Sequence, residues 1–200
     1  MMRSRPYRTG RPDIVLYGGP GSGKSTQAGL LAKKLSARYL NMGASLRLFS
    51  RSQSHDGILT YQLLAAGKLA PVRITNGLVQ KFVGSTPLRR LIIFDGYPRN
   101  LIQLRFFEKL LPRRHRFAVM VYIKLPIAAA KQRLLKRART ENRADDQNVA
   151  ALTERLRIFH REAKTLLAHY RKQKLLITIN GNQTISRVTA DIYRAVRVLQ

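Results

Sequence analysis

The pattern of hydrophobic and polar positions divides the chain into short apolar runs and longer stretches with helical periodicity. Apolar runs rich in β-forming residues predict buried strands at 13–17, 39–41, 91–95, 117–124 and 175–179. Helical spacing of apolar residues predicts helices at 27–35, from Met42, and at 56–66, 72–83, 100–111, 127–139, 148–172 and 185–199. Strands that alternate with helices indicate an α/β fold, with a five-stranded parallel sheet flanked by helices on both faces.

A glycine-rich stretch stands between the first expected strand and the first expected helix. It reads Gly18-Gly19-Pro20-Gly21-Ser22-Gly23-Lys24-Ser25-Thr26 and fits the phosphate-binding pattern G-x-x-x-x-G-K-[ST] at every fixed position. Glycines let the backbone wrap a polyphosphate, while the loop N–H groups and the helix N-terminus point at the anion. We predict a three-layer P-loop NTPase fold in which residues 19–26 bind ATP, although a turn that only caps a helix is the alternative.

Within this loop, two residue types carry the expected chemistry. Lys24 is placed to reach the β- and γ-phosphates, and Ser25 or Thr26 offers a hydroxyl toward Mg²⁺.

Length and composition are consistent with one compact domain, which we place at 13–199. A flexible basic arm is expected at 1–12, with an organelle transit peptide as the alternative. No apolar run reaches the ~18 residues that span a membrane. The absence of cysteine excludes disulfides and cysteine-ligated zinc. We expect a cytoplasmic monomer, with a mitochondrial location as the alternative.

The charge of the chain is strongly unbalanced. Lys and Arg number 38 against 10 Asp and Glu, so the formal net charge is +28. Such a charge attracts nucleotides, nucleic acids and acidic membrane surfaces. A nucleotide-binding enzyme needs some of these positive charges but hardly all of them. Contact with nucleic acid or the ribosome is therefore expected as an accessory property, and a generally basic solvated surface is the alternative.

A second motif narrows the choice among P-loop NTPase families. The expected strand at 91–95 ends on an acid and continues as Phe94-Asp95-Gly96-Tyr97-Pro98-Arg99. With the glycine loop, in this order and separation, it resembles the adenylate kinase family of nucleoside monophosphate kinases. Weaker matches extend the resemblance over roughly 13–199, at Gly43 with Leu46-Arg47, 67–71, 133–137, and 143–146 with Arg155-Leu156. The resemblance implies a helical insertion at 41–84 that binds the monophosphate, and a short lid at 137–147.

Arginines stand where phosphoryl transfer would use them. The acceptor phosphate oxygen is already an anion, so the reaction needs positive charge, alignment and exclusion of water but no general base. The resemblance implies that Arg47 and Arg99 hold the acceptor monophosphate. It also implies that Arg137, Arg143 and Arg155 close over the transferring group. Arginine suits both roles because its planar fork binds phosphate bidentately.

The remaining roles concern the metal ion and the lid. Asp95 ends a buried strand, where a carboxylate would hold the Mg²⁺ of ATP through water together with Ser25. The resemblance implies that Arg133 lies near the donor base and that Asp145 and Asp146 brace the lid, although capping of the next helix is the alternative for the two aspartates. Asn142 stands where a glycine is common before the lid arginine, which could stiffen closure.

The acceptor base is indicated by two conflicting signals. Gln103 stands where adenylate kinases read the acceptor adenine with a glutamine, and its amide can both donate and accept. Met42, also expected in the acceptor site, replaces the usual threonine, and Ala44 replaces the usual aspartate. Residues 71–75, where Arg73 replaces an acid, are closer to pyrimidine-monophosphate kinases.

These observations leave three hypotheses. The leading one is an adenylate kinase that converts ATP and AMP into two ADP by in-line transfer. The first alternative is a UMP/CMP-type kinase. The second is a weakened kinase fold recruited as an RNA- or ribosome-binding component, favoured by the excess charge and opposed by the retained Lys24 and Asp95.

Overall fold

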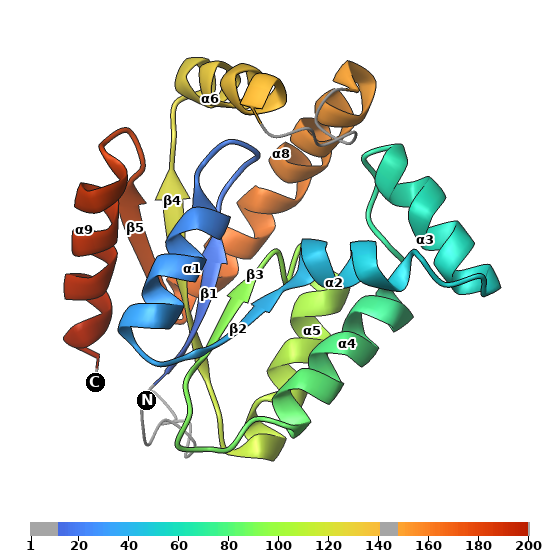
Figure 1. Ribbon diagram of the computed structural model, residues 1–200. Helices are drawn as coiled ribbons and strands as arrows, with labels where there is room; N and C mark the ends of the chain where they lie inside the picture. The colour runs from blue at the N-terminus through green and yellow to red at the C-terminus, as the bar shows by residue number, and fades with distance from the viewer. Residues whose placement is uncertain (1–11, 141–147, 200) are drawn as a thin grey trace.

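Five parallel strands form one sheet in the computed structural model, which describes residues 12–140 and 148–199 (Figure 1). Of residues 135–140 it gives the helical backbone alone. The strands are β1 (Asp13–Tyr17), β2 (Arg38–Asn41), β3 (Ile92–Asp95), β4 (Ala118–Lys124) and β5 (Leu176–Asn180), in the spatial order β2-β3-β1-β4-β5. Every neighbouring pair is parallel. This confirms the predicted five-stranded parallel sheet, with strand starts within about one residue of the expected positions.

The helices occupy the stretches where helical spacing predicts them. They are α1 (Lys24–Lys34), α2 (Met42–Phe49), α3 (His55–Ala65), α4 (Val72–Gly84), α5 (Leu101–Leu110), α6 (Ile127–Thr140), α8 (Val149–Lys172) and α9 (Ile185–Arg197). A short 3-10 helix, η1 (Pro112–Arg114), follows α5. Proline at its first position is compatible with a helical turn because the N–H that it lacks would have no partner there.

Capping side chains explain where several helices begin. The Asn100 side chain accepts a hydrogen bond from the Gln103 N–H, and Asn148 accepts from two N–H groups, so α5 and α8 start one residue later than expected. Asn41 caps α2 in the same way, accepting from the Ala44 N–H at 2.9 Å. The last residue of β2 therefore ends the strand and starts the helix, which fixes the angle between them.

Alternate strand residues point to opposite faces of the sheet, and each face has its own helices. Ile14, Leu16 and Ile93 pack with α1 and α9. Val15 and Phe94, which point to the other face, pack with α4, α5 and α8. The fully buried strands read as continuous apolar runs because both faces are covered, as expected for a parallel sheet. The result is the three-layer arrangement visible in Figure 1.

The segment between β2 and β3 contributes no strand in the described chain. It consists of α2, α3 and α4, and Figure 1 shows α3 projecting from the side of the molecule beside the upper end of the sheet. Arg73 of α4 forms a two-pronged ion pair with Asp56 of α3. The pair lowers the pKa of the Asp56 carboxyl below its ordinary value. None of the described helices is long and apolar enough to cross a membrane.

The strand order decides which residues meet at the carboxyl edge of the sheet. Because β3 lies between β1 and β2, Asp95 is in register with Leu16 on one side and Asn41 on the other. The glycine loop follows β1 at once, and α2 follows β2 at once. Ligands bind at such an edge in open parallel sheets, so the fold brings both sequence motifs to one place.

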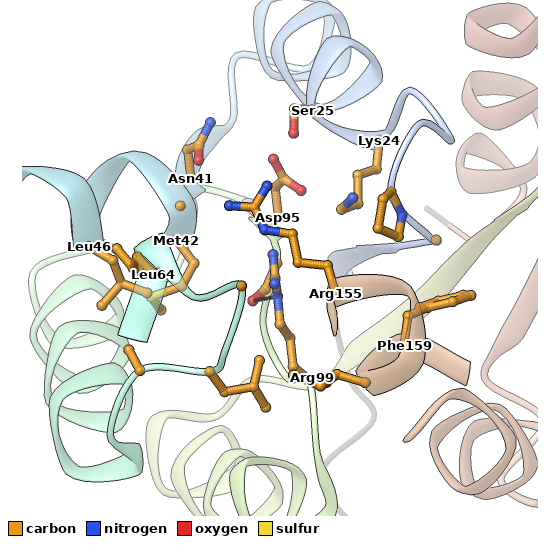
Figure 2. Close-up of a pocket in the computed structure, with 18 of the residues that line it drawn as sticks. Lys24, Ser25, Asn41, Met42, Leu46, Leu64, Asp95, Arg99, Arg155 and Phe159 are labelled. Atoms are coloured by element: carbon orange, nitrogen blue, oxygen red, sulfur yellow. Dashed lines mark hydrogen bonds between the residues drawn. The ribbon is translucent and has the colours of Figure 1, made fainter. Parts of the chain in front are cut away.

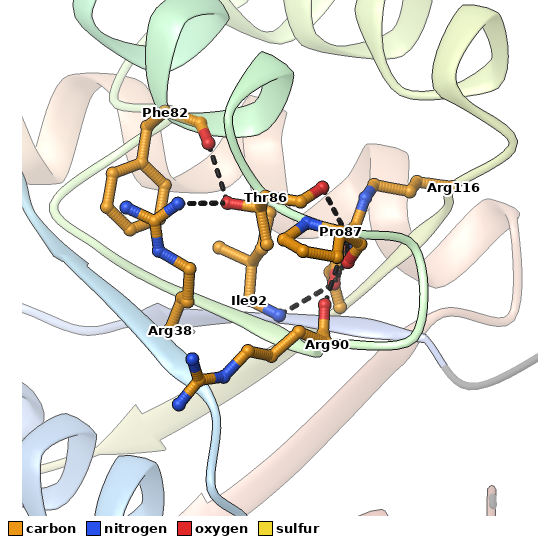
Figure 3. A network of polar contacts seen from close by, with 8 residues as sticks. Arg38, Phe82, Thr86, Pro87, Arg90, Ile92 and Arg116 are labelled. Carbon is orange, nitrogen blue, oxygen red and sulfur yellow. Dashed lines mark hydrogen bonds and ion pairs between the residues drawn. The ribbon is translucent and has the colours of Figure 1, made fainter.

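A buried ion pair lies at the opposite edge of the sheet, where the strands begin. Arg116, 6% exposed, donates to both carboxylate oxygens of Asp13, which is 1% exposed and also accepts from the Ile92 N–H. The bonds to Asp13 come from the Arg116 Nη1. The Arg116 Nη2 donates to the carbonyl oxygens of Thr86, Pro87 and Arg90 (Figure 3). One guanidinium thus ties the turn before β3 to the first residue of β1.

We predict that Arg116→Met lowers the free energy of unfolding by about 3–5 kcal/mol, because the variant leaves a buried carboxylate without its cation. Burial raises the pKa of Asp13 from 3.8 to about 6, against the attraction of Arg116. A pKa raised in the folded state makes stability fall as pH rises through that value. Losing the cation enlarges this fall, so urea unfolding should reveal a larger deficit at about pH 8 than at about pH 5.

The matched control is the double variant Asp13→Asn/Arg116→Met, which removes the charge that Arg116 compensates. It should lose less stability than Arg116→Met alone and should have little pH dependence between those two values. Equal losses in the single and double variants would show that the carboxylate does not need Arg116.

Candidate active site

The glycine loop leaves β1 and runs directly into α1. Gly21 and Gly23 have φ angles of 80° and 85°, in the left-handed region that favours glycine. Gly23 is the N-cap of α1; it makes no side-chain hydrogen bond, and the first turn of α1 contains no acidic residue. In this described part of the chain, the N–H groups at the helix end are therefore not occupied by a capping side chain, and they can face an anion.

One cavity lies against this loop and extends to the ends of β2 and β3 (Figure 2). Lys24 and Ser25 line it, and the Lys24 Nζ lies 3.4 Å from the Gly19 carbonyl oxygen. Of the predicted ATP-binding residues, Pro20 and Gly21 also line the cavity, whereas Gly19, Ser22, Gly23 and Thr26 do not. The side chains of Lys24 and Ser25, which could contact a phosphate, therefore both line the cavity. Contacts between a phosphate and the backbone N–H groups of the loop stay a prediction.

Asp95 is held by a hydrogen-bond network that sequence reasoning missed. Its carboxylate is 3% exposed and accepts a hydrogen bond from the Tyr39 hydroxyl at 3.0 Å. The Asn41 amide donates to the same hydroxyl at 3.0 Å, and that hydroxyl also lies 3.5 Å from the Ser25 carbonyl oxygen. Burial raises the pKa of Tyr39, and the Asp95 carboxylate raises it further, so the hydroxyl keeps the proton that it donates.

The signal for this network lies in the register of the strands rather than in any motif. Tyr39 and Asn41 are two residues apart on β2 and therefore point to the same face of the sheet. Only the pairing of β2 with β3 reveals that they lie beside Asp95. Ala44, where the family usually has an aspartate, is exposed on α2 and offers no polar side chain. The carboxyl edge of the sheet is therefore organised by a tyrosine and an asparagine in this chain.

Arginines converge on the same cavity from three elements. Arg47 of α2, Arg99 after β3 and Arg155 of α8 all line it. Figure 2 shows Arg155 reaching toward Asp95, with Arg99 beside it. The Arg99 Nε donates to the Gly96 carbonyl oxygen at 3.0 Å. Burial by surrounding protein atoms lowers the pKa of Arg99 below its ordinary value. The positive charge of Arg155 also lowers this pKa, whereas the Asp95 carboxylate raises it. Cations that repel each other across a cavity favour an anion between them.

Gln103 and Met42 occupy the part of the cavity that extends toward α4. Gln103 is 2% exposed; its Oε1 accepts from the Arg99 backbone N–H at 2.7 Å, and its Nε2 donates to the Thr75 hydroxyl at 3.1 Å. An amide oxygen accepts two hydrogen bonds and an amide nitrogen donates two, so one place remains at each end for a base. Met42 is 2% exposed and adds apolar lining with Leu46 and Leu64.

The remaining predicted residues are Arg133 and the residues of the lid. Arg133 lies outside the lining of the cavity and donates to the carbonyl oxygens of Gly181 and Gln183, which follow β5. The predicted lid lies mostly outside the described residues. This holds for Asn142, Arg143, Asp145, Asp146 and the side chain of Arg137. Their roles stay predictions.

The oxygen ligands at the cavity suit a magnesium ion carried by ATP. Mg²⁺ prefers hard oxygen ligands and usually takes one or two carboxylates together with waters and substrate phosphates. Asp95 supplies one buried carboxylate and Ser25 one hydroxyl beside the phosphate loop. No group of three or more acidic, histidine or cysteine side chains that could hold a metal occurs among the described residues. The set fits an ion that arrives with a nucleotide better than a resident one.

Comparison with known proteins agrees with this geometry. The family model described as adenylate kinase matches residues 16–175. An adenylate kinase of Cyanothece sp. is 34% identical over 188 residues, covering 94% of this chain and 96% of that protein. An adenylate kinase of Bacteroides thetaiotaomicron is 30% identical over 185 residues, covering 92% and 97%. Human adenylate kinase isoenzyme 5 is 32% identical over 189 residues, which are 93% of this chain and 33% of that longer protein.

The geometry and the comparisons indicate the same class of enzyme. One cavity is lined by the phosphate loop, an aspartate and several arginines, and the adenylate kinase model and relatives match most of the chain. The chain belongs to the adenylate kinase family and is an ATP-dependent nucleoside monophosphate kinase.

Proposed function

We propose that the chain transfers the γ-phosphoryl group of ATP to AMP and releases two molecules of ADP. The observation that carries the proposal is the single cavity that is lined by the phosphate loop, by Arg47 and Arg99, and by Gln103. Donor and acceptor bound at the two ends of one cavity would have their phosphates facing each other. Alignment of that kind supplies much of the catalysis of phosphoryl transfer.

The roles of Lys24, Arg47, Arg99 and Arg155 rest on their positions in the cavity, and those of Arg133, Arg137 and Arg143 rest on the family resemblance. Lys24 contacts the β- and γ-phosphates of ATP, and the N-terminus of α1 faces them. Arg47 and Arg99 bind the acceptor phosphate, while Arg155 neutralises charge on the transferring group. Arg137 and Arg143 close over it from the lid, and Arg133 lies near the donor base. The segments 41–84 and 137–147 act as the acceptor-binding insertion and the lid.

The magnesium ion would be held by Ser25 and, through water, by Asp95. When bound, it neutralises charge on the β- and γ-phosphates of ATP. The Tyr39 hydroxyl donates to Asp95 and fixes the orientation of its carboxylate. The Asn41 amide in turn orients the Tyr39 hydroxyl.

The proposal extends to the surroundings of the enzyme, which we place in the cytoplasm as a monomer. The absence of cysteine is compatible with a reducing compartment, and the basic arm at 1–12 leaves a mitochondrial location as the alternative. The excess of basic side chains supports an additional, non-specific nucleic-acid partner.

We predict that AMP has the highest kcat/KM among AMP, CMP, UMP and GMP in a coupled assay of ADP formation. A base that cannot pair with the remaining donor and acceptor of Gln103 leaves a buried amide unsatisfied, which costs about 1–3 kcal/mol. This predicts a preference of about tenfold to hundredfold.

Two variants complete this experiment. Gln103→Asn shortens the side chain and should reduce the preference for AMP, and the loop variant Lys24→Ala is the inactive control. Faster turnover of CMP or UMP by the wild type would show that residues 71–75 are the better guide and that the chain is a pyrimidine-monophosphate kinase.

We predict that Arg99→Ala raises the KM for the acceptor by about tenfold to hundredfold and changes the Kd for ATP much less. Hydrogen bonds to a charged group contribute about 1.5–3 kcal/mol. Titrating ATP and the monophosphate separately checks the assignment. The matched control is Arg105→Ala, an exposed arginine of α5 that does not line the cavity. A larger defect for ATP than for the acceptor would place Arg99 on the donor side.

We predict that Tyr39→Phe raises the Mg²⁺ concentration needed for half-maximal activity by about tenfold. The variant loses one hydrogen bond to a carboxylate, worth about 1.5 kcal/mol, which is about a tenfold change. Electron paramagnetic resonance of Mn²⁺ bound to the enzyme–ATP complex measures the same affinity without turnover. Tyr61→Phe, on an exposed tyrosine of α3, is the control. Unchanged Mn²⁺ affinity in Tyr39→Phe would contradict a positioning role.

A further inference from the structure

The edge of the sheet opposite the cavity carries a concentration of exposed positive charge. In a parallel sheet, every loop that precedes a strand lies at the same edge. The loops and helix ends that precede β3, β4 and β5 contain Arg89, Arg90, Arg113, Arg114, Lys172 and Lys174, all of them exposed. We refer to these six residues as the basic edge.

The structure joins these loops into one surface. The Arg116 side chain donates to three carbonyl oxygens of the turn that contains Arg89 and Arg90, which holds this turn against the start of β4. The Met120 N–H donates to the Leu175 carbonyl oxygen, which holds the loop before β5 against β4. These segments precede strands that span β3-β1-β4-β5, so at a strand spacing of about 4.8 Å the basic edge is about 14 Å wide.

Positive charge continues from the basic edge onto the ends of α1 and α9. Lys34 lies 3.9 Å from the centre of the Tyr193 ring, and Arg197 is exposed in the last turn of α9. These two helices end at the same edge of the sheet, because each runs back from the carboxyl ends of the strands (Figure 1).

Acidic residues do not neutralise the basic edge within the described chain. Asp13 is buried and already paired with Arg116, and Glu108 binds His169 and Gln173. No ion pair between any basic-edge residue and an acidic side chain is found among the described residues. The positive charges are therefore solvated rather than compensated.

Stabilisation of helix ends accounts for only part of this charge. A cation in the last turn of a helix is favourable because it faces the negative end of the helix dipole, and Lys172 fits this description. Arg89 and Arg90 follow the Pro87 turn and end no helix, and Arg113 and Arg114 lie in the three-residue η1. The Arg90 Nε donates to the Ser36 carbonyl oxygen at 3.2 Å and so joins two turns at this edge. Among the described residues, the side chains of Arg89, Arg113 and Arg114 make no hydrogen bond or ion pair.

From this arrangement we propose that the basic edge binds the phosphate backbone of duplex nucleic acid, independently of base sequence. A wide surface with arginine at its centre matches a duplex, which presents one negative charge per about 1.7 Å of its axis. Arginine binds phosphate bidentately and is weakly hydrated. An anionic membrane fits less well, because the exposed apolar residues Leu88 and Val198 at this edge are scattered and form no amphipathic helix face.

The binding surface lies at the opposite edge of the sheet from the catalytic cavity, so the two activities should be separable. A duplex on the basic edge leaves the phosphate loop, Asp95 and Arg99 uncovered. Kinase activity should therefore continue in the complex, and failure of one proposal would leave the other intact.

The test is fluorescence anisotropy with a labelled duplex of about 20 base pairs, as DNA and as RNA, between about 50 and 200 mM salt. We expect affinity for both duplexes to fall steeply with salt. Replacing Arg89, Arg90, Arg113 and Arg114 by Gln should weaken binding by about tenfold or more and reduce the salt slope by about 0.9 per lost phosphate contact.

The matched control removes the same charge from other exposed positions, by replacing Arg105, Arg161, Lys164 and Arg187 with Gln. It should bind almost as the wild type does. Both variants should keep the wild-type kcat and KM for ATP and AMP, which shows that they are folded. Equal weakening in the two variants would overturn the proposal, because binding would then depend on net charge alone.

Two further measurements separate the basic edge from other anion sites. Saturating ADP should not displace the duplex; displacement would show that the nucleic acid enters the catalytic cavity. Vesicles of phosphatidylserine and phosphatidylcholine should bind more weakly than the duplex at the same salt concentration. Tighter binding to vesicles, or no binding to either duplex at 50 mM salt, would also overturn the proposal.

Discussion

The position of Asp95 between two neighbouring strands is the constraint on which the site depends. Parallel pairing sets Asp95 in register with Leu16 of β1 and Asn41 of β2. From that register follow the distance to the phosphate loop, the hydrogen bond from Tyr39 and the approach of α2. A shift of either pairing by one residue would turn alternate side chains to the wrong face. The two apolar cores that cover the sheet therefore also position the Asp95 carboxylate.

Charge is balanced differently at the two edges of the sheet. At the carboxyl edge, Arg99 and Arg155 line one cavity, where burial lowers the pKa of Arg99 and the positive charge of Arg155 lowers it further. At the other edge, the one buried arginine, Arg116, already has its carboxylate, and the exposed arginines around it stay in water. The first arrangement suits a small, tightly held anion. The second suits an extended anion whose binding weakens with salt.

The architecture could be predicted from sequence because its signals are local. Apolar runs and helical spacing identify the strands and helices, and two motifs identify the family. The errors at the starts of α5 and α8 come from Asn100 and Asn148, whose side chains act as caps while their backbone lies outside the helix.

The details of the site depend on contacts between residues far apart in the chain. Gln103 is suited to read a base, yet only the fold reveals that it also binds the Arg99 backbone and the Thr75 hydroxyl. Its two internal hydrogen bonds give it a second function, since they hold the turn that carries Arg99 against α4 and α5. If Gln103 and Arg99 have the roles proposed for them, a shorter side chain at 103 would loosen the acceptor phosphate site as well as the base site. The proposal therefore couples acceptor specificity to phosphate alignment through one buried amide, and a change in the preferred base is expected to alter turnover too.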